Sequence, residues 1–200
     1  MTASGPPASP PSPSPVLHLL AGSNGAGKST LAERVLQPVT GLPFVNADRI
    51  AAEHWSEDPE GHAYDAAALA DEERRRLMDE RASFIAETVF SHRSKVELVQ
   101  DAVSAGYVVY LHVVLIPEDT SVRRVESRVV LGGHSVPETK VRGRYSRLWA
   151  LVAEARNTAT HTIVYDNSRA KDPFRKVATF NNGVLVGTAD WPVWTPLELI

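Results

Sequence analysis

The sequence contains no cysteine and carries little net charge. Lysine and arginine number 21 among the 200 residues, aspartate and glutamate number 24, and the formal net charge is −3. Without cysteine the chain forms neither disulfides nor thiolate metal sites, which is compatible with the reducing cytoplasm, so we expect a cytoplasmic protein. A charge so near zero spreads no basic field over the surface, and nucleic acid is therefore not the expected partner.

Long apolar runs are also missing. No segment approaches the roughly 20 apolar residues of a membrane-spanning helix, so no membrane association is expected. The first 15 residues lack the cationic and apolar stretches of a secretion signal. They are mostly Pro, Ser, Ala and Gly, which bury little surface, and we expect a disordered tail over residues 1–15. Aromatic residues make up only 7% of the chain, and the tryptophans lack the regular basic surroundings of a base-stacking surface.

Residues 16–200 are predicted to form one α/β domain. A hydrophobic content of 43% is sufficient for a sizeable core in a chain of this length. Short apolar segments alternate with helical patterns, which indicates a parallel sheet flanked by helices. Near the end, an Asn-Asn-Gly turn at 181–183 between two apolar runs predicts a β-hairpin. The expected strands lie at 16–21, 43–46, 84–88, 107–115 and 162–165.

The segment AGSNGAGKST follows the first expected strand and matches the phosphate-binding loop pattern Gly-x-x-x-x-Gly-Lys-Ser, which predicts binding of a nucleoside triphosphate. Glycines in such a loop let successive backbone NH groups point inward, and the following helix presents its positive N-terminus to the phosphates. Lys28 is expected to reach the terminal phosphates, and the Ser29 hydroxyl to bind Mg²⁺. The predicted ATP-binding residues in this loop are Gly22, Ser23, Asn24, Gly25, Ala26, Gly27, Lys28, Ser29 and Thr30.

Ligands of an open parallel sheet bind at the carboxyl ends of its strands, so the residues that follow each strand are candidates for the site. Asp48 follows the second strand and is the predicted catalytic base and acceptor-binding residue; holding Mg²⁺ through a water is an alternative role. A third interpretation is a helix N-cap without any catalysis. The strand over 107–115 ends in Leu-Ile-Pro and offers no second carboxylate for magnesium. The functional hypothesis therefore depends more strongly on Asp48.

Polar groups beside large apolar ones end the third expected strand. Glu87, Thr88 and Ser91 lie in the sequence ETVFS, a mixture typical of a polyol or sugar pocket. We predict that all three bind the acceptor. Glu87 either orients the acceptor hydroxyl or supports the metal, and the alternative is an edge carboxylate that faces water.

An arginine-rich region over residues 120–150 predicts a small helical lid. Arg124 and Arg128 are one turn apart without an acid at helical spacing, so an outside anion is a natural partner. In the next helix Arg144 also lacks an acid, whereas Arg142 can pair with Glu138. Arg128 and Arg144 are the predicted catalytic arginines, Arg124 a predicted substrate-binding one, and a solvated basic face is the alternative.

Two further residues are candidates for the site. His134 lies in the Gly-Gly-His corner between the lid helices and either contacts substrate or has a structural role. Asn167 follows the strand at 162–165 and either lines the adenine pocket of an ATP site or belongs to an ordinary Asp-Asn-Ser turn. No zinc-binding motif is present.

Taken together, AGSNGAGKST, VNADRIAAE, ETVFS, RRVESRVVLGGHSVPETKVRGRY and YDNS resemble the zeta-toxin family of P-loop kinases over roughly residues 16–170. The resemblance implies phosphorylation of a small acceptor by ATP with Mg²⁺, and UDP-N-acetylglucosamine, attacked through its 3′-hydroxyl, is the substrate of the well-known toxins. It also implies an antitoxin protein as a partner. Asp48 then corresponds to the catalytic base, Glu87 to the acceptor pocket, and Arg128 and Arg144 to the lid arginines.

Two alternatives use the same loop. A nucleoside or antibiotic kinase performs the same reaction with a different pocket. A nucleotide-hydrolysing switch ATPase that acts on a protein partner needs no acceptor.

Overall fold

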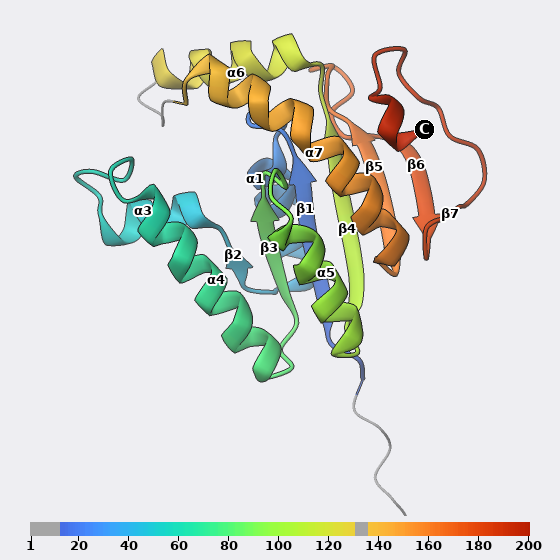
Figure 1. Cartoon of the computed structure of the whole chain (residues 1–200), viewed down its shortest axis with the longest axis horizontal. Helices are drawn as coiled ribbons and strands as arrows, with labels where there is room; N and C mark the ends of the chain where they lie inside the picture. Colours follow the sequence, from blue (N-terminus) through green and yellow to red (C-terminus); the bar gives the residue numbers. More distant parts are fainter. Residues whose placement is uncertain (1–12, 131–135) are drawn as a thin grey trace, which may run out of the picture.

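A single, mostly parallel sheet organises the computed structural model, which describes residues 13–130 and 136–200. In the described residues the sheet has the strand order β2-β3-β1-β4-β5-β6-β7, and pairing is parallel from β2 to β5 and antiparallel beyond (Figure 1). The strands are β1 (Val16–Gly22), β2 (Phe44–Val45), β3 (Phe84–Thr88), β4 (Val108–Leu115), β5 (His161–Asp166), β6 (Arg175–Asn181) and β7 (Val184–Leu185).

Helices connect the parallel strands, as the alternating pattern predicted. A continuous helical segment follows β1 and contains α1, the π-helical turn η1 and α2. The helical elements are α1 (Lys28–Leu31), η1 (Ala32–Leu36), α2 (Gln37–Thr40), α3 (Ala47–His54), α4 (Ala63–Asp79), α5 (Ser94–Ser104), α6 (Glu118–Val130), α7 (Glu138–Thr158) and the 3₁₀ turn η2 (Leu197–Leu199). None of the helices within the described ranges combines the length and apolar character that crossing a bilayer requires.

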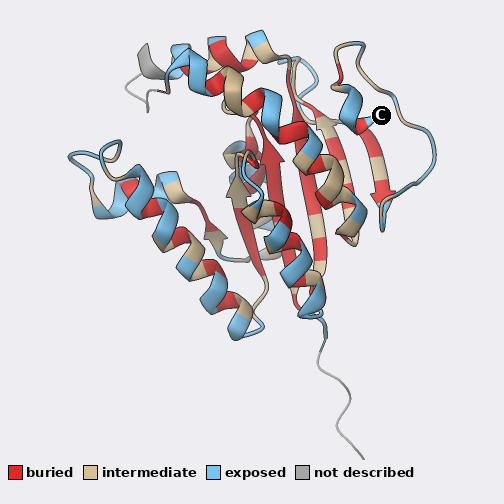
Figure 2. Ribbon diagram, in the orientation of Figure 1, coloured by how far each residue is buried: buried red, intermediate tan, exposed pale blue. Residues whose placement is uncertain are grey.

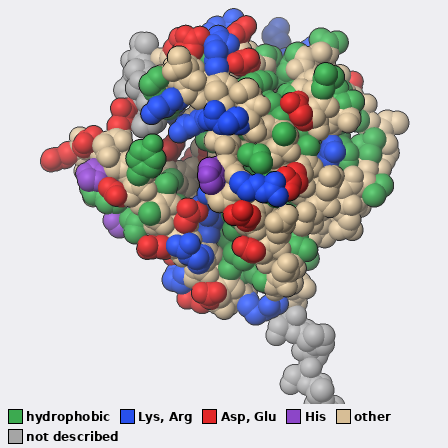
Figure 3. All heavy atoms as spheres, in the orientation of Figure 1, with side chains coloured by type: hydrophobic (Ala, Val, Ile, Leu, Met, Phe, Trp, Pro, Cys, Tyr) green, Lys and Arg blue, Asp and Glu red, His purple; other side chains and the backbone are tan. Residues whose placement is uncertain are grey.

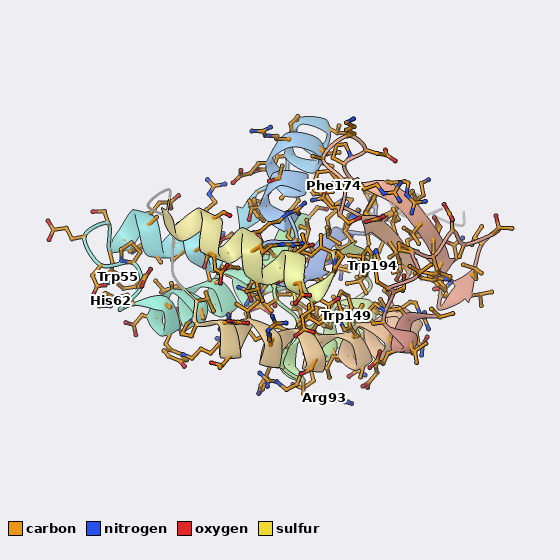
Figure 4. The ribbon with its side chains drawn as sticks, turned by 90° about the horizontal axis from the view of Figure 1, so that it is seen from above. Trp55, His62, Arg93, Trp149, Phe174 and Trp194 are labelled. Atoms are coloured by element: carbon orange, nitrogen blue, oxygen red, sulfur yellow. The ribbon has the colours of Figure 1, made fainter. Side chains whose placement is uncertain are left out.

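The core lies on both faces of the sheet, and β1 and β4 are buried at its centre (Figure 2). The larger cluster packs α4, α5 and α7 against one face. Trp149 is buried there and Trp194 packs against the cluster (Figure 4). Trp191 also packs against it. A smaller cluster on the other face is covered by the helix after β1.

The two ends of the domain agree with the sequence patterns. The carbonyl of Pro15 accepts a hydrogen bond from the Val108 amide (2.9 Å), so the chain joins the sheet just before β1. Residues 1–12 of the predicted tail lie outside the described residues. The predicted hairpin is confirmed as β6 and β7. Its turn has φ 46° at Asn182 and 76° at Gly183, the two positive values that a type I′ turn requires.

A ladder of histidine and tyrosine rings crosses the middle of the sheet on the face of the smaller cluster. His18 on β1 and His112 on β4 share a hydrogen bond between Nδ1 and Nε2 (3.0 Å), and His112 Nδ1 lies 3.3 Å from the hydroxyl of Tyr165 on β5. His112 is only 3% exposed. Burial, and secondarily the charge of His18, lower the pKa of His112 to about 3.

The buried His112 should therefore make the fold sensitive to acid. The unfolded state takes up a proton near pH 6.5 and the folded state only near pH 3, so stability is complete above the former value and is lost as the pH falls below it. Between pH 7 and 5 the free energy of unfolding should fall by about 2 kcal/mol through this residue. Denaturant titrations should show the full loss in the native sequence and in His54→Gln, which replaces an exposed histidine. His112→Gln should show a smaller loss, because only His18, whose pKa burial also lowers, still contributes from this ladder. An equal loss in all three proteins would contradict the assignment.

Candidate active site

The candidate site is a cavity of about 600 Å³ at the carboxyl ends of β1 and β3. It is lined by the phosphate loop, the start of α3, α4 and the end of β3. Its remaining wall comes from α6 and α7, which we call the two lid helices. In Figure 3 the surface is hollowed beside α4, and Lys and Arg side chains border the hollow. The predicted residues Asn24, Gly25, Gly27, Lys28, Ser29, Thr30, Asp48, Glu87, Thr88, Ser91, Arg124, Arg128 and Arg144 all line this cavity.

The phosphate loop has the backbone geometry that its glycines predicted. Gly22, Gly25 and Gly27 have φ values of 152°, 70° and 98°. A Cβ atom on Gly22 would lie 2.5 Å from the carbonyl oxygen of Val114 on β4. The loop therefore passes so close to β4 that only glycine fits at this position.

The carboxylate of Glu87 is the centre of a hydrogen-bond network below the loop. Its Oε2 accepts hydrogen bonds from the Ser29 hydroxyl (2.7 Å) and from Nδ2 of Asn46 (2.6 Å). Its Oε1 lies 3.6 Å from Nζ of Lys28. Because Glu87 contacts both the lysine and the serine of the phosphate loop, its position fits support of the metal and the triphosphate better than an edge carboxylate facing water.

Lys28 is held inside the phosphate loop. Its side chain is 5% exposed and its Nζ donates a hydrogen bond to the Ser23 carbonyl (2.9 Å). Burial lowers the pKa of Lys28, while the charges of Glu87 and Asp48 partly oppose that shift. The ammonium group is thus directed to the concave side of the loop, where the terminal phosphates of a nucleotide would lie.

Asp48 faces the cavity and does not cap its helix. The N-cap of α3 is Asn46, whose side chain accepts a hydrogen bond from the Arg49 amide (3.0 Å). Asp48 lies in the first turn and lines the cavity together with the loop. The interpretation of Asp48 as an N-cap was therefore wrong, because Asn46, two residues earlier, already satisfies the orphan amide.

Arg124 and Asn167 form hydrogen bonds with the backbone of the phosphate loop. The Arg124 guanidinium donates hydrogen bonds to the carbonyls of Gly25 (3.3 Å) and Asn167 (2.9 Å), and Nδ2 of Asn167 donates one to the carbonyl of Ala26 (2.8 Å). A Cβ atom on Gly27 would lie 2.5 Å from Nδ2 of Asn167 and 3.5 Å from the ring of Phe174. These contacts connect the loop to α6 and to the segment after β5, a positioning role that the sequence did not predict.

The two lid helices pack through small apolar side chains. Val122 and Val125 of α6 form a buried cluster with Val141 of α7. Arg128 and Arg144 line the cavity from α6 and α7. His134 and the glycine corner before it lie outside the described residues.

The arginines of α7 differ in their partners as the sequence predicted. Arg142 forms ion pairs with Glu138 (2.8 Å), Asp119 (3.0 Å) and Glu118 (3.4 Å). Within the described ranges, Arg144 forms no hydrogen bond or ion pair. Arg142 therefore connects α6 to α7, whereas Arg144 lines the cavity without such partners among the described residues.

A family model for the zeta toxin matches residues 3–177 of the chain. The chain belongs to the zeta toxin family. No protein of curated function matched in a sequence comparison. Among solved structures, the AvrRxo1-ORF1:AvrRxo1-ORF2 complex with sulphate ions aligns with a TM-score of 0.67 at 19% identity, over 86% of this chain and 60% of that one.

A second solved structure comes from the PezAT toxin–antitoxin system of Streptococcus pneumoniae. It aligns with a TM-score of 0.56 at 15% identity, over 78% of this chain and 69% of that one. At such identities the alignments establish the shared fold. The chain spans only 60% of the AvrRxo1 protein to which it is similar. A large part of that protein therefore has no counterpart in the aligned region of this zeta toxin family member.

The residues around Glu87 fit a magnesium ion of a zeta toxin family nucleotide site. The Ser29 hydroxyl and the Glu87 carboxylate are 2.7 Å apart, and both offer the oxygen ligands that Mg²⁺ prefers. Across the part of the chain that the structure describes, no group of three or more His, Cys, Asp or Glu side chains is arranged as a metal site.

Sequence reasoning missed two cations at the α4 end of the cavity. Arg74 of α4 and Lys95 of α5 both line it. Arg74 belongs to the charged run DEERRR, which gives no direct sign of which arginine is buried. The signal was a spacing of four, four and three residues, which places Arg74 on one helix face with Ala66, Ala70 and Leu77, the other buried residues of α4.

Proposed function

We propose that the chain is an ATP-dependent kinase that transfers the γ-phosphoryl group to a hydroxyl of a small metabolite. The observation that carries this proposal is the cavity that joins the phosphate loop, Asp48 and the lid arginines. Membership of the zeta toxin family supports it, as does a related AvrRxo1 complex solved with ATP.

Each group of residues in the cavity has a separate role in such a transfer. The carboxylate of Asp48 accepts the proton of the attacking hydroxyl. Lys28, the loop NH groups and the lid arginines stabilise charge on the phosphoryl oxygens, where most of the catalysis of phosphoryl transfer lies. Ser29 would bind Mg²⁺. Glu87 would orient the hydroxyl of the acceptor or bind the metal through water. The metal neutralises charge on the β- and γ-phosphates when bound.

The finer proposals concern the acceptor and a protein partner. UDP-N-acetylglucosamine is the first acceptor to test, because the sequence motifs resemble those of the toxins that use it. A protein antitoxin is the proposed partner. The solved complexes AvrRxo1-ORF1:ORF2 and PezAT, to which the chain is similar, support this proposal.

Incubation with MgATP should produce a phosphorylated metabolite. A pooled metabolite extract, and UDP-N-acetylglucosamine alone, should each yield a species heavier by one phosphate in mass spectrometry, with one ADP formed per product. Lys28→Met should abolish the product, because the loop loses the charge that binds the terminal phosphates. Release of ADP and inorganic phosphate without any phosphorylated metabolite would favour the switch ATPase instead.

A further inference from the structure

The wall that α4 presents to the cavity changes from neutral to cationic along the helix. Ala63, Ala67, Ala70 and Arg74 line the cavity, and their spacing of four, three and four residues places them on one helix face. The three methyl groups span about two helical turns and leave room for a ligand. The guanidinium of Arg74 forms the end of this wall, and the side chain of Arg74 is only 7% exposed.

Arg74 shares its counter-ion with a second cation. Asp71 Oδ1 contacts a guanidinium nitrogen of Arg74 and lies 3.3 Å from Nζ of Lys95. Burial opposes ionisation of Asp71, but the hydrogen bond and charge of Arg74 and the charge of Lys95 outweigh it and keep the pKa of Asp71 low. One carboxylate, itself 45% exposed, thus serves two cations, and a net positive charge remains at this end of the cavity.

The nucleotide does not account for that positive charge. The cavity-lining cations on α1 and the lid helices are Lys28, Arg124, Arg128 and Arg144. Their charge is balanced by the cavity carboxylates Asp48 and Glu87, together with a magnesium–nucleotide complex of net charge about −2. Arg74 and Lys95 lie on α4 and α5, outside this balance, and a partly buried unbalanced charge favours an anionic ligand.

We propose that Arg74 and Lys95 bind an anionic group of the acceptor, a phosphate or a carboxylate, so that the enzyme selects alcohols that already carry negative charge. The selection of acceptors rests on the proposed kinase function, but anion binding by Arg74 and Lys95 can be tested separately. The planar guanidinium contacts two anion oxygens, and the ammonium adds a point charge. The Ala63, Ala67 and Ala70 face accommodates the part of the acceptor between that anion and Asp48.

Anion binding is measured first, on the full chain saturated with MgCl₂ and a non-hydrolysable ATP analogue that fills the phosphate loop. Calorimetric titration with inorganic phosphate should then detect one further site, and titration with acetate tests the carboxylate. Arg74→Gln and Lys95→Met should each weaken the phosphate site at least tenfold, while binding of the analogue stays unchanged. The matched control is Arg75→Gln, since Arg75 is the exposed neighbour on α4.

The outcomes separate this inference from the kinase proposal. Analogue binding without a further phosphate or acetate site, or a site unchanged in both variants, overturns the anion site and leaves the kinase proposal standing. Should Arg74→Gln fail to fold, Lys95→Met decides, because that side chain is less buried.

A kinetic comparison gives the second readout. Pairs of acceptors that differ by one phosphate or carboxylate group, such as sugar phosphates, sugar acids and the parent sugars, should be phosphorylated only in their anionic forms. The two variants should raise KM for the anionic acceptor at least tenfold with little change in KM for ATP. Preference for neutral acceptors would overturn the anion site, whereas transfer to no acceptor at all would count against the kinase proposal.

Discussion

Asp48→Asn should lower the rate of phosphoryl transfer by a factor of about 10² to 10⁴, the usual contribution of a general base. The amide is nearly the same size and still lines the cavity, but it cannot accept the proton of the acceptor hydroxyl. Calorimetry should give an ATP affinity within about twofold of the native value, because Lys28 and the loop NH groups are unchanged. The turnover number is measured with the acceptor that the metabolite screen identifies.

The matched control is Glu53→Gln on the same helix, where the carboxylate is 64% exposed and pairs with Arg49 at 3.8 Å. That variant should keep full activity. The Asp48 substitution also removes an acid from the first turn of α3, which costs only about 0.3–1 kcal/mol of stability. Unchanged turnover in Asp48→Asn would remove this residue from the role of base.

The fold was predictable because its elements follow local rules. Near-continuous apolar runs predicted β1 and β4, which are buried on both faces. The glycine spacing predicted the loop, and the Asn-Gly pair predicted the final hairpin. Each of these features is set by backbone conformation or burial within a few neighbouring residues, so the sequence pattern is sufficient to reveal it.

The site was predictable only as a set of residues, because its contacts join distant segments. Asn46 was part of the recognised motif, but its contact with Glu87 spans 41 residues and no spacing rule indicates it. For the same reason, Arg124, one of the lid arginines that lack acids at helical spacing, donates hydrogen bonds to backbone carbonyls of the loop and of Asn167. Helical spacing identifies missing partners within a helix and says nothing about partners elsewhere.

Arg144→Ala should reduce turnover by about 10³ to 10⁵, which corresponds to about 4–7 kcal/mol of barrier, because a lid arginine stabilises charge that develops on the transferring phosphoryl group. The neighbouring Arg142→Ala is the matched control. Arg142 already has three acidic partners on two helices, so its loss should loosen the lid and change turnover far less.

A third variant, Arg144→Lys, separates charge from geometry. Lysine keeps the positive charge but lacks the planar fork that contacts two phosphoryl oxygens, so its rate should fall between those of the native protein and the alanine variant. If the arginine acts in the transition state, kcat falls while the affinity for ATP changes little. Equal and small effects of Arg142→Ala and Arg144→Ala would instead identify the lid arginines as a solvated basic face, and the catalytic charge would have to come from Lys28 and the loop alone.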